Sequence, residues 1–138
     1  MAVRSNVGER KGIVIVEAAI LFPLLLLLTL GIIEYGWMFL KAEDAASAAR
    51  HGARLASRPD ATNAEVQLGI RRLMTAAGLG NSGYAVTIRP GDVGALAPGE
   101  PLTVEVAIPY RNIALTGSPL MPVPPDLRAS VTMVKEGP

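Results

Sequence analysis

The sequence has no cysteine and only one histidine, His51, among its 138 residues. The lack of cysteine excludes disulfides, thiolate-bound metal clusters and a thiol nucleophile, and one imidazole gives almost no basis for a histidine metal site. Aromatic residues are also scarce, at 4% of the chain. Basic and acidic residues nearly balance, 13 against 12, so the net charge of +1 points to no particular partner.

Enzyme motifs are missing as well. The sequence contains no G-x-S-x-G, HExxH, P-loop or EF-hand spacing. The acidic residues Asp92, Glu100 and Glu105 have no candidate base beside them. We therefore expect no enzymatic activity and no catalytic residues, metal site, cofactor or small-molecule substrate.

One long apolar run dominates what is present. Residues 13–33 read IVIVEAAILFPLLLLLTLGII and carry a single charge, Glu17. Such a run is long enough to cross a bilayer core of about 30 Å at about 1.5 Å per residue. Tyr35 and Trp37 follow it and suit the membrane–water interface. Glu34, beside them, is expected to be hydrated there.

The charges around the run predict its orientation. Three basic residues precede it, namely Arg4, Arg10 and Lys11. The positive-inside rule then places the N-terminus in the cytoplasm and the residues after Lys41 outside, in the periplasm. A removable secretory signal is the alternative, with a cleavage-like Ala46-Ser47-Ala48. Its apolar core would be shorter, whereas the apolar region here includes the carboxylates Glu17 and Glu34 and stops well before that site.

The segment after the membrane favours one unbroken helix. Residues 40–58, LKAEDAASAARHGARLASR, are rich in alanine and lack proline, so the helix should continue to about Ser57. Small residues recur at spacings of three and four and form a face suited to close helix packing. We assign helix packing to Ala45, Ala49, Gly52 and Ala53.

A row of arginines, Arg50, Arg54 and Arg58, lies beside this face. We interpret the row as solvated cations that complement the helix C-terminus. Contact with acidic lipid or with a partner subunit is the alternative. No aromatic platform accompanies the arginines, so we expect no nucleic-acid partner.

The rest of the chain predicts a small α+β domain. Thr62 and Glu65 have the spacing of a capping box. The helix that they begin should end near Gly78 and present one apolar face, formed by Val66, Ile70, Leu73, Met74 and Ala77. Alternating apolar residues predict three strands, at 84–88, 102–108 and 127–133. The proline-rich segment TGSPLMPVPPD before the third strand is too restricted to pair.

The expected fold class is therefore α+β: a long N-terminal transmembrane helix that continues into the periplasm, a short second helix, and a small antiparallel three-stranded sheet packed on the long helix. We divide the chain into a cytoplasmic leader (1–12), a transmembrane helix (13–40), the periplasmic continuation of that helix (41–58) and the small α+β domain (59–138).

Glu17 is the most informative residue of the apolar run. A carboxylate at membrane depth costs about 2.5–3.5 kcal/mol on insertion scales and needs a cation or a proton. Cleavage between Gly12 and Ile13 would create an α-ammonium one helical turn away, at a helix N-terminus that favours negative charge. The alternative is a Glu17 that only snorkels to the cytoplasmic interface.

These residues carry a family resemblance. KGIVIVE at 11–17 resembles the class III signal of type IV pilins, which a prepilin peptidase cuts after glycine, leaving glutamate fifth. Glu17, Ala19 and Pro23 match the E-x-A-x-x-x-P of TadE-like pseudopilins of tight-adherence (Tad, or Flp) pili. AARHGAR at 48–54 is similar to that family's A-A-R-x-G-A-R helix. The resemblance covers about residues 12–56, with departures at Ala18 and His51.

The resemblance implies a minor pseudopilin that takes part in assembly of adhesive Tad pili. Its implied partners are a prepilin peptidase, other pilins or pseudopilins, inner-membrane assembly proteins and membrane lipid. Assembly would involve Glu17 and Pro23, where Pro23 is either a tolerated membrane proline or a bend that helps subunits enter a filament. The alternative function is an uncleaved, single-pass adaptor or assembly factor of a secretion or pilus platform in the bacterial inner membrane.

Overall fold

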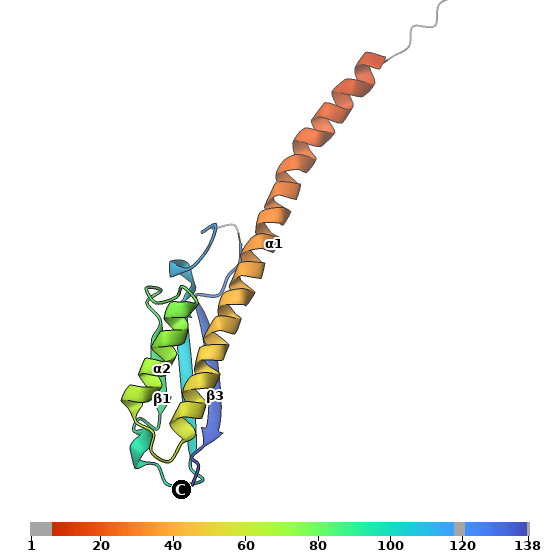
Figure 1. Cartoon of the computed structure of the whole chain (residues 1–138). Coiled ribbons are helices and arrows are strands. Elements are labelled where there is room, and N and C mark those ends of the chain that lie inside the picture. Colours follow the sequence, from red (N-terminus) through yellow and green to blue (C-terminus); the bar gives the residue numbers. More distant parts are fainter. Residues whose placement is uncertain (1–6, 118–120, 138) are drawn as a thin grey trace, which may run out of the picture.

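The computed structural model describes residues 7–117 and 121–137, with side chains from Val14 onward. Its elements are helix α1 (Val7–Ser57), helix α2 (Asn63–Ala76), strand β1 (Ala85–Arg89), 3-10 turn η1 (Val93–Ala95), strand β2 (Pro101–Pro109), 3-10 turn η2 (Tyr110–Asn112) and strand β3 (Asp126–Val134). Figure 1 shows α1 as a long shaft, with the other elements gathered along its C-terminal half. The expected α+β fold class is confirmed.

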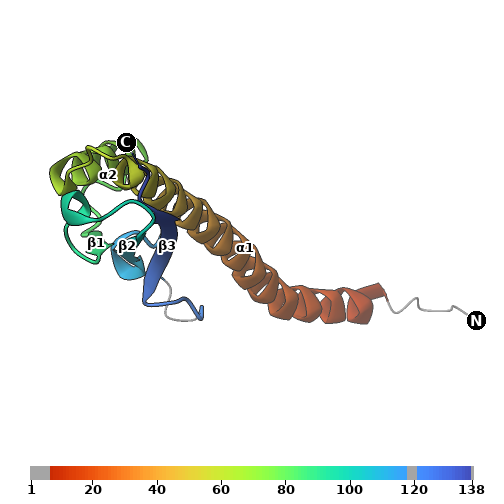
Figure 2. The ribbon, with the colours of Figure 1, turned by 90° about the horizontal axis from the view of Figure 1, so that it is seen from below.

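Helix α1 is continuous from its first described turn to Ser57, where the alanine-rich segment was expected to end it. Pro23 lies inside the helix without breaking it. Figure 2 shows that α1 bends within its orange-to-red N-terminal part. At the other end, buried Lys135 donates from Nζ to the carbonyl oxygens of Ala56 (3.3 Å) and Arg58 (2.6 Å). A cation thus satisfies carbonyls at the negative end of the helix dipole.

Helix α2 begins with the predicted capping box. The Thr62 side chain accepts from the Glu65 amide, and the Glu65 carboxylate accepts from the Thr62 amide. Gly78, at φ +74°, follows the helix in a conformation that favours glycine. The buried stripe of α2 is narrower than expected: it holds Val66, Ile70 and Met74, whereas Leu73 is 36% exposed. Residues spaced by four face the core, and Leu73 lies to one side of that stripe.

The three predicted strands form one antiparallel sheet in the order β1-β2-β3. The register pairs Ile88 with Val104 and Val104 with Val131. Every second residue of β2 is buried, so the apolar residues of the alternating pattern face the core, as predicted. The opposite face carries charged side chains, with Glu105 of β2 paired to Arg89 and Arg128 of the flanking strands.

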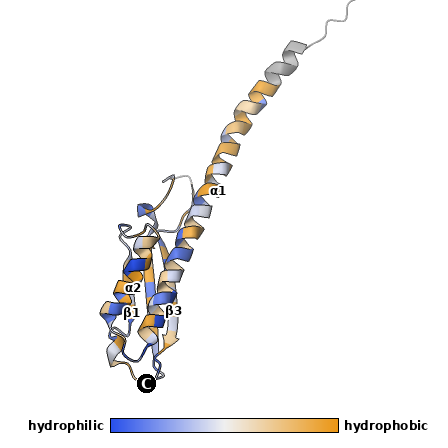
Figure 3. Cartoon of the chain, viewed as in Figure 1, coloured by the Kyte–Doolittle hydropathy of each residue, from blue (hydrophilic) through white to orange (hydrophobic). Residues whose placement is uncertain are grey.

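The core lies between the inner face of the sheet, α2 and the alanine-rich part of α1. Its apolar members include Val104, Val106, Ile70 and Met74 together with buried alanines of α1. A Cβ added at Gly52 would lie 2.6 Å from Ile70 Cδ1, which shows how closely α1 approaches α2. Figure 3 shows the long apolar stretch of α1 outside this core.

Candidate functional site

The uncovered part of α1 is the first functional feature. The apolar side chains from Val14 to Leu28 are exposed, for example Ile20 and Phe22 at 69% each. By length and composition this one helix is able to cross a membrane, and none of its most apolar stretch is buried by the described residues. The chain therefore has the form of a single-pass membrane protein with an α+β domain on its C-terminal side.

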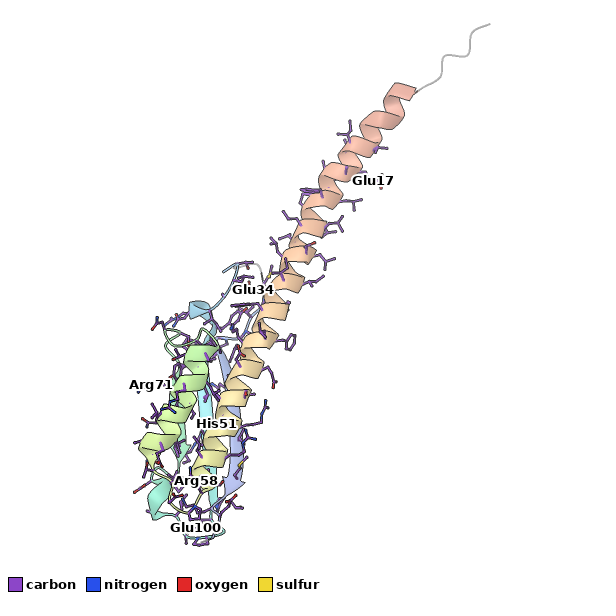
Figure 4. All side chains as sticks on the ribbon, in the orientation of Figure 1. Glu17, Glu34, His51, Arg58, Arg71 and Glu100 are labelled. Carbon is purple, nitrogen blue, oxygen red and sulfur yellow. The ribbon has the colours of Figure 1, made fainter. Side chains whose placement is uncertain are left out.

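Glu17 lies on this uncovered shaft and is exposed. In Figure 4 it projects from the shaft at a distance from the α+β domain. Among the side chains that the structure describes, Glu17 forms no hydrogen bond or ion pair. Gly12 and Ile13, the expected cleavage site, lie in the α1 backbone, and their side chains are outside the described residues. Pro23 is on the same shaft, between Glu17 and the domain.

The small residues assigned to helix packing are buried in the chain's own fold. Ala45 is 1% exposed, and Ala49 and Ala53 are not exposed at all. Gly52 lies between them against Ile70 and Val104. These positions attach α2 and the sheet to α1, so a large residue there would disturb the domain before it could affect contact with another subunit.

Glu34 is where the structure corrects the sequence analysis most. This residue is not hydrated: it is 2% exposed. Its Oε1 accepts from the Tyr110 hydroxyl and from the Leu115 amide (3.2 Å), and its Oε2 accepts from the Thr116 amide (2.7 Å) and hydroxyl (2.8 Å). The four donors come from η2 and the segment after it, which wraps against α1 at this point. We call this arrangement the Glu34 clasp.

The clasp also affects Tyr110, which is 1% exposed. Burial raises the pKa of the Tyr110 phenol well above its ordinary value, and the hydrogen bond to Glu34 and the charge of Glu34 raise it further. The phenol therefore stays protonated and keeps donating to the carboxylate. A buried carboxylate is costly unless it accepts hydrogen bonds. Glu34 therefore stabilises the arrangement in which η2 and the segment after it supply its donors.

The residues beyond Glu34 add further contacts between α1 and the domain. Tyr35 donates from its hydroxyl to the Pro122 carbonyl (2.8 Å), and Trp37 donates from Nε1 to the Ile113 carbonyl (2.7 Å). Lys41, one turn on, lies 4.7 Å above the Trp37 ring and donates to the Ala77 carbonyl (2.8 Å). The aromatic pair expected at a membrane interface is thus also the attachment point of the domain.

A pocket of about 590 Å³ opens beside the clasp. Glu34 and Tyr110 form part of its wall, together with Arg111, Met121 and Val123. Because the pocket is at the end of the domain nearest the uncovered shaft, it belongs to the same junction. Sequence reasoning did not find this junction, although a carboxylate directly followed by two interfacial aromatics was a signal for it.

The arginine row is solvated, as interpreted from the sequence. Arg50 pairs with Glu43 and Arg58 with Asp60, and all four side chains are about half exposed or more. Arg54 is exposed as well. Pairs of this kind contribute little to stability. His51, in contrast, is half-buried. Its ring lies close to Gly69 of α2, where an added Cβ would be 3.3 Å from His51 Nε2.

Comparison with known proteins adds one family match, which falls on helix α1. The class that the fold defines is a single-pass membrane protein whose α+β domain is built on the continuation of its membrane helix. A family model described as TadE-like protein matches residues 12–54. Over this segment the chain is similar to the TadE-like family, which confirms the resemblance for this part of the sequence. No curated protein and no solved structure matches it significantly.

Proposed function

We propose that the chain is a minor pseudopilin of a Tad (Flp) pilus, which takes part in pilus assembly and surface attachment. A prepilin peptidase cuts it between Gly12 and Ile13. Before assembly the N-terminus faces the cytoplasm and the α+β domain lies in the periplasm. The observation that carries the proposal is the position of Glu17: exposed on an uncovered apolar shaft, inside the segment that matches the TadE-like family.

The uncovered shaft supports a role in assembly. In the bilayer, lipid covers the apolar side chains between Val14 and Ile33. In a filament, the corresponding shafts of neighbouring pilins or pseudopilins would replace the lipid. This exchange buries the same apolar area in both states, so a selective polar contact decides the register.

Glu17 is suited to supply that contact. After cleavage its carboxylate meets either the Ile13 ammonium of its own chain or that of a neighbouring subunit. Only the second pair exists solely in the assembled state. Desolvation offsets much of the attraction, so the pair contributes more to selecting the correct register than to net stability.

N-terminal sequencing of the protein from its native membrane tests the cleavage. We expect the mature chain to begin at Ile13, and Gly12→Ala to be processed because alanine is also small. Gly12→Leu should leave the leader in place. A mature N-terminus at Met1 or Ala2 in cells that carry the matching peptidase would refute the processed pseudopilin and favour the uncleaved membrane-anchored adaptor.

Glu17→Ala tests the role in assembly. We expect normal membrane insertion and a folded domain, because the substitution removes a costly charge far from the core, but reduced co-purification with pilus components and reduced surface piliation. Leu24→Ala, at a side chain 62% exposed on the same shaft, is the matched control and should assemble. Wild-type piliation with Glu17→Ala would show that the carboxylate is dispensable.

A fusion after Pro138 tests the orientation. A reporter that is active only outside the cytoplasm should work at this position. Activity of a cytoplasm-only reporter there would reverse the topology, and the proposed function depends on that topology.

A further inference from the structure

The segment that the Glu34 clasp holds against α1 is unusual in its composition and its position. No charged residue occurs between Arg111 and Asp126. We use the name proline-rich loop for its described residues, 113–117 and 121–125. Two apolar side chains project from the loop: Leu115 is 53% exposed and Val123 is 37% exposed. Singly exposed apolar side chains are common, but these two lie beside a second exposed apolar surface, the shaft of α1, and a larger exposed apolar surface is typical of a membrane contact.

The height of the loop along α1 is fixed by its hydrogen bonds. The Leu115 and Thr116 amides donate to Glu34, and the Pro122 carbonyl accepts from Tyr35. In Figure 1 the chain after β2 extends beyond the sheet along α1, toward the N-terminal half of the shaft. The loop is therefore the part of the domain nearest the uncovered shaft.

This height coincides with the expected edge of the bilayer. Residues 14–33 form about 30 Å of helix at about 1.5 Å per residue, which equals the thickness of a typical hydrocarbon core. Glu34 is the next residue, and the hydrogen bonds between α1 and the domain begin there. A bilayer that covers residues 14–33 consequently ends where the proline-rich loop begins.

We propose that the proline-rich loop is a second membrane contact, in which Leu115 and Val123 enter the interfacial region of the bilayer that α1 spans. The occupant of this surface is lipid, since the shaft beside it requires the same covering. The uncharged loop meets no electrostatic barrier at the headgroups, and its prolines leave few backbone N–H groups to desolvate. The contact would hold the domain at a fixed depth and tilt on the membrane before assembly. It depends on α1 crossing the membrane and not on a role in a pilus.

Spin labelling tests the contact directly, because the chain has no cysteine and each introduced cysteine is unique. Leu115→Cys and Val123→Cys would be labelled with a nitroxide in the full chain, reconstituted in phosphatidylcholine–phosphatidylglycerol vesicles. Accessibility to oxygen, which concentrates in lipid, is compared with accessibility to a water-soluble nickel chelate. Ser130→Cys, on the exposed face of β3, is the aqueous control, and Leu28→Cys on the shaft is the lipid control.

We expect the oxygen-to-nickel accessibility ratio at positions 115 and 123 to be several-fold higher than at position 130 and to approach that at position 28. Equal ratios at positions 115, 123 and 130 would overturn the proposal. Protection from both reagents would overturn it too, because it would indicate that a protein, such as a second copy of the chain, covers the loop.

The native chain offers a second measurement that needs no substitution. Trp37 is the single tryptophan and is hydrogen-bonded to the loop at Ile113. In vesicles of brominated lipids, bromines near the headgroup should quench its fluorescence more than bromines near the chain ends. Trp37 reports the position of the bilayer edge on α1, on which the contact depends: stronger quenching by deep bromines, or no quenching at any depth, would place that edge away from the loop and would refute the contact.

Discussion

The Glu34 clasp leads to the sharpest prediction about stability. Glu34→Gln keeps the size and shape of the side chain but replaces one acceptor oxygen with an amide group that donates. Each carboxylate oxygen accepts one backbone N–H, from Leu115 or from Thr116. Whichever way the glutamine amide is oriented, one of these N–H groups faces another donor.

The magnitude follows from these contacts. Hydrogen bonds to a charged acceptor contribute about 1.5–3 kcal/mol each, and an unsatisfied buried donor costs about 1–3 kcal/mol. The hydroxyls of Tyr110 and Thr116 are able to rotate and accept from the new amide, and loss of a buried charge removes its desolvation cost. We therefore expect Glu34→Gln to lower the free energy of unfolding by about 2–4 kcal/mol.

Urea unfolding of the full chain in mild detergent measures this change, and Trp37, one turn from Glu34, is the fluorescent reporter. The matched control is Glu43→Gln, the same substitution on the same helix at a side chain that is 70% exposed and paired with Arg50. Exposed pairs contribute about 0–1 kcal/mol, so the control should be nearly neutral. If both variants lost equally little stability, the clasp would not fix the domain to α1.

Three further predictions use the same assay. Gly52→Ala should be less stable than Gly36→Ala by about 1–3 kcal/mol, because a Cβ at Gly52 lies 2.6 Å from Ile70 Cδ1 and one at Gly36 meets nothing within 4 Å. Adding Ile70→Val to Gly52→Ala should recover part of the loss. Equal stabilities of the two glycine variants would contradict the close approach of α1 and α2. Lys135→Met should cost about 1–3 kcal/mol by leaving carbonyls at the end of α1 unpaired, and a neutral effect would contradict the capping role. Because the folded-state pKa of Tyr110 is above its ordinary value of 10.0, the contribution of its phenol to the free energy of unfolding is complete below pH 10 and declines as the pH rises further. Tyr110→Phe should remove this part of the alkaline destabilisation. An unchanged pH profile of stability would contradict the role of the phenol.

The elements of the fold were predictable because their signals are local. The end of α1 at Ser57 follows from Pro59, and the start of α2 follows from the capping box of Thr62 and Glu65. The strands follow from alternation with a period of two residues, which β2 satisfies at every position. Each of these signals lies within a few residues of the element that it defines.

The Glu34 clasp was not predictable in the same way, because its donors lie far away in the sequence. Tyr110 and Thr116 are 76 and 82 residues from Glu34, and nothing in their own neighbourhood marks them as partners of a carboxylate. Lys135 and the end of α1 are separated similarly, by 79 residues to Ala56. The contacts exist only once the sheet is placed on α1, so they depend on the tertiary fold and not on a local motif.

Two carboxylates on α1, Glu17 and Glu34, differ in whether the tertiary fold supplies their hydrogen-bond partners, and this difference bears on function. Glu17 and Glu34 both interrupt apolar sequence, and their energetic problem is the same: a charge in or near a membrane needs a partner. For Glu34 the chain supplies four donors, so its role is completed within the subunit and its substitution should affect folding. For Glu17 the described side chains supply no partner, and under the proposed function the compensating charge comes from the cleaved N-terminus or from a neighbouring subunit. The residue whose partner is missing from its own domain is the one suited to assembly, and the pair of substitutions separates the two roles: Glu34→Gln should destabilise the isolated subunit, and Glu17→Ala should leave it stable but poorly assembled.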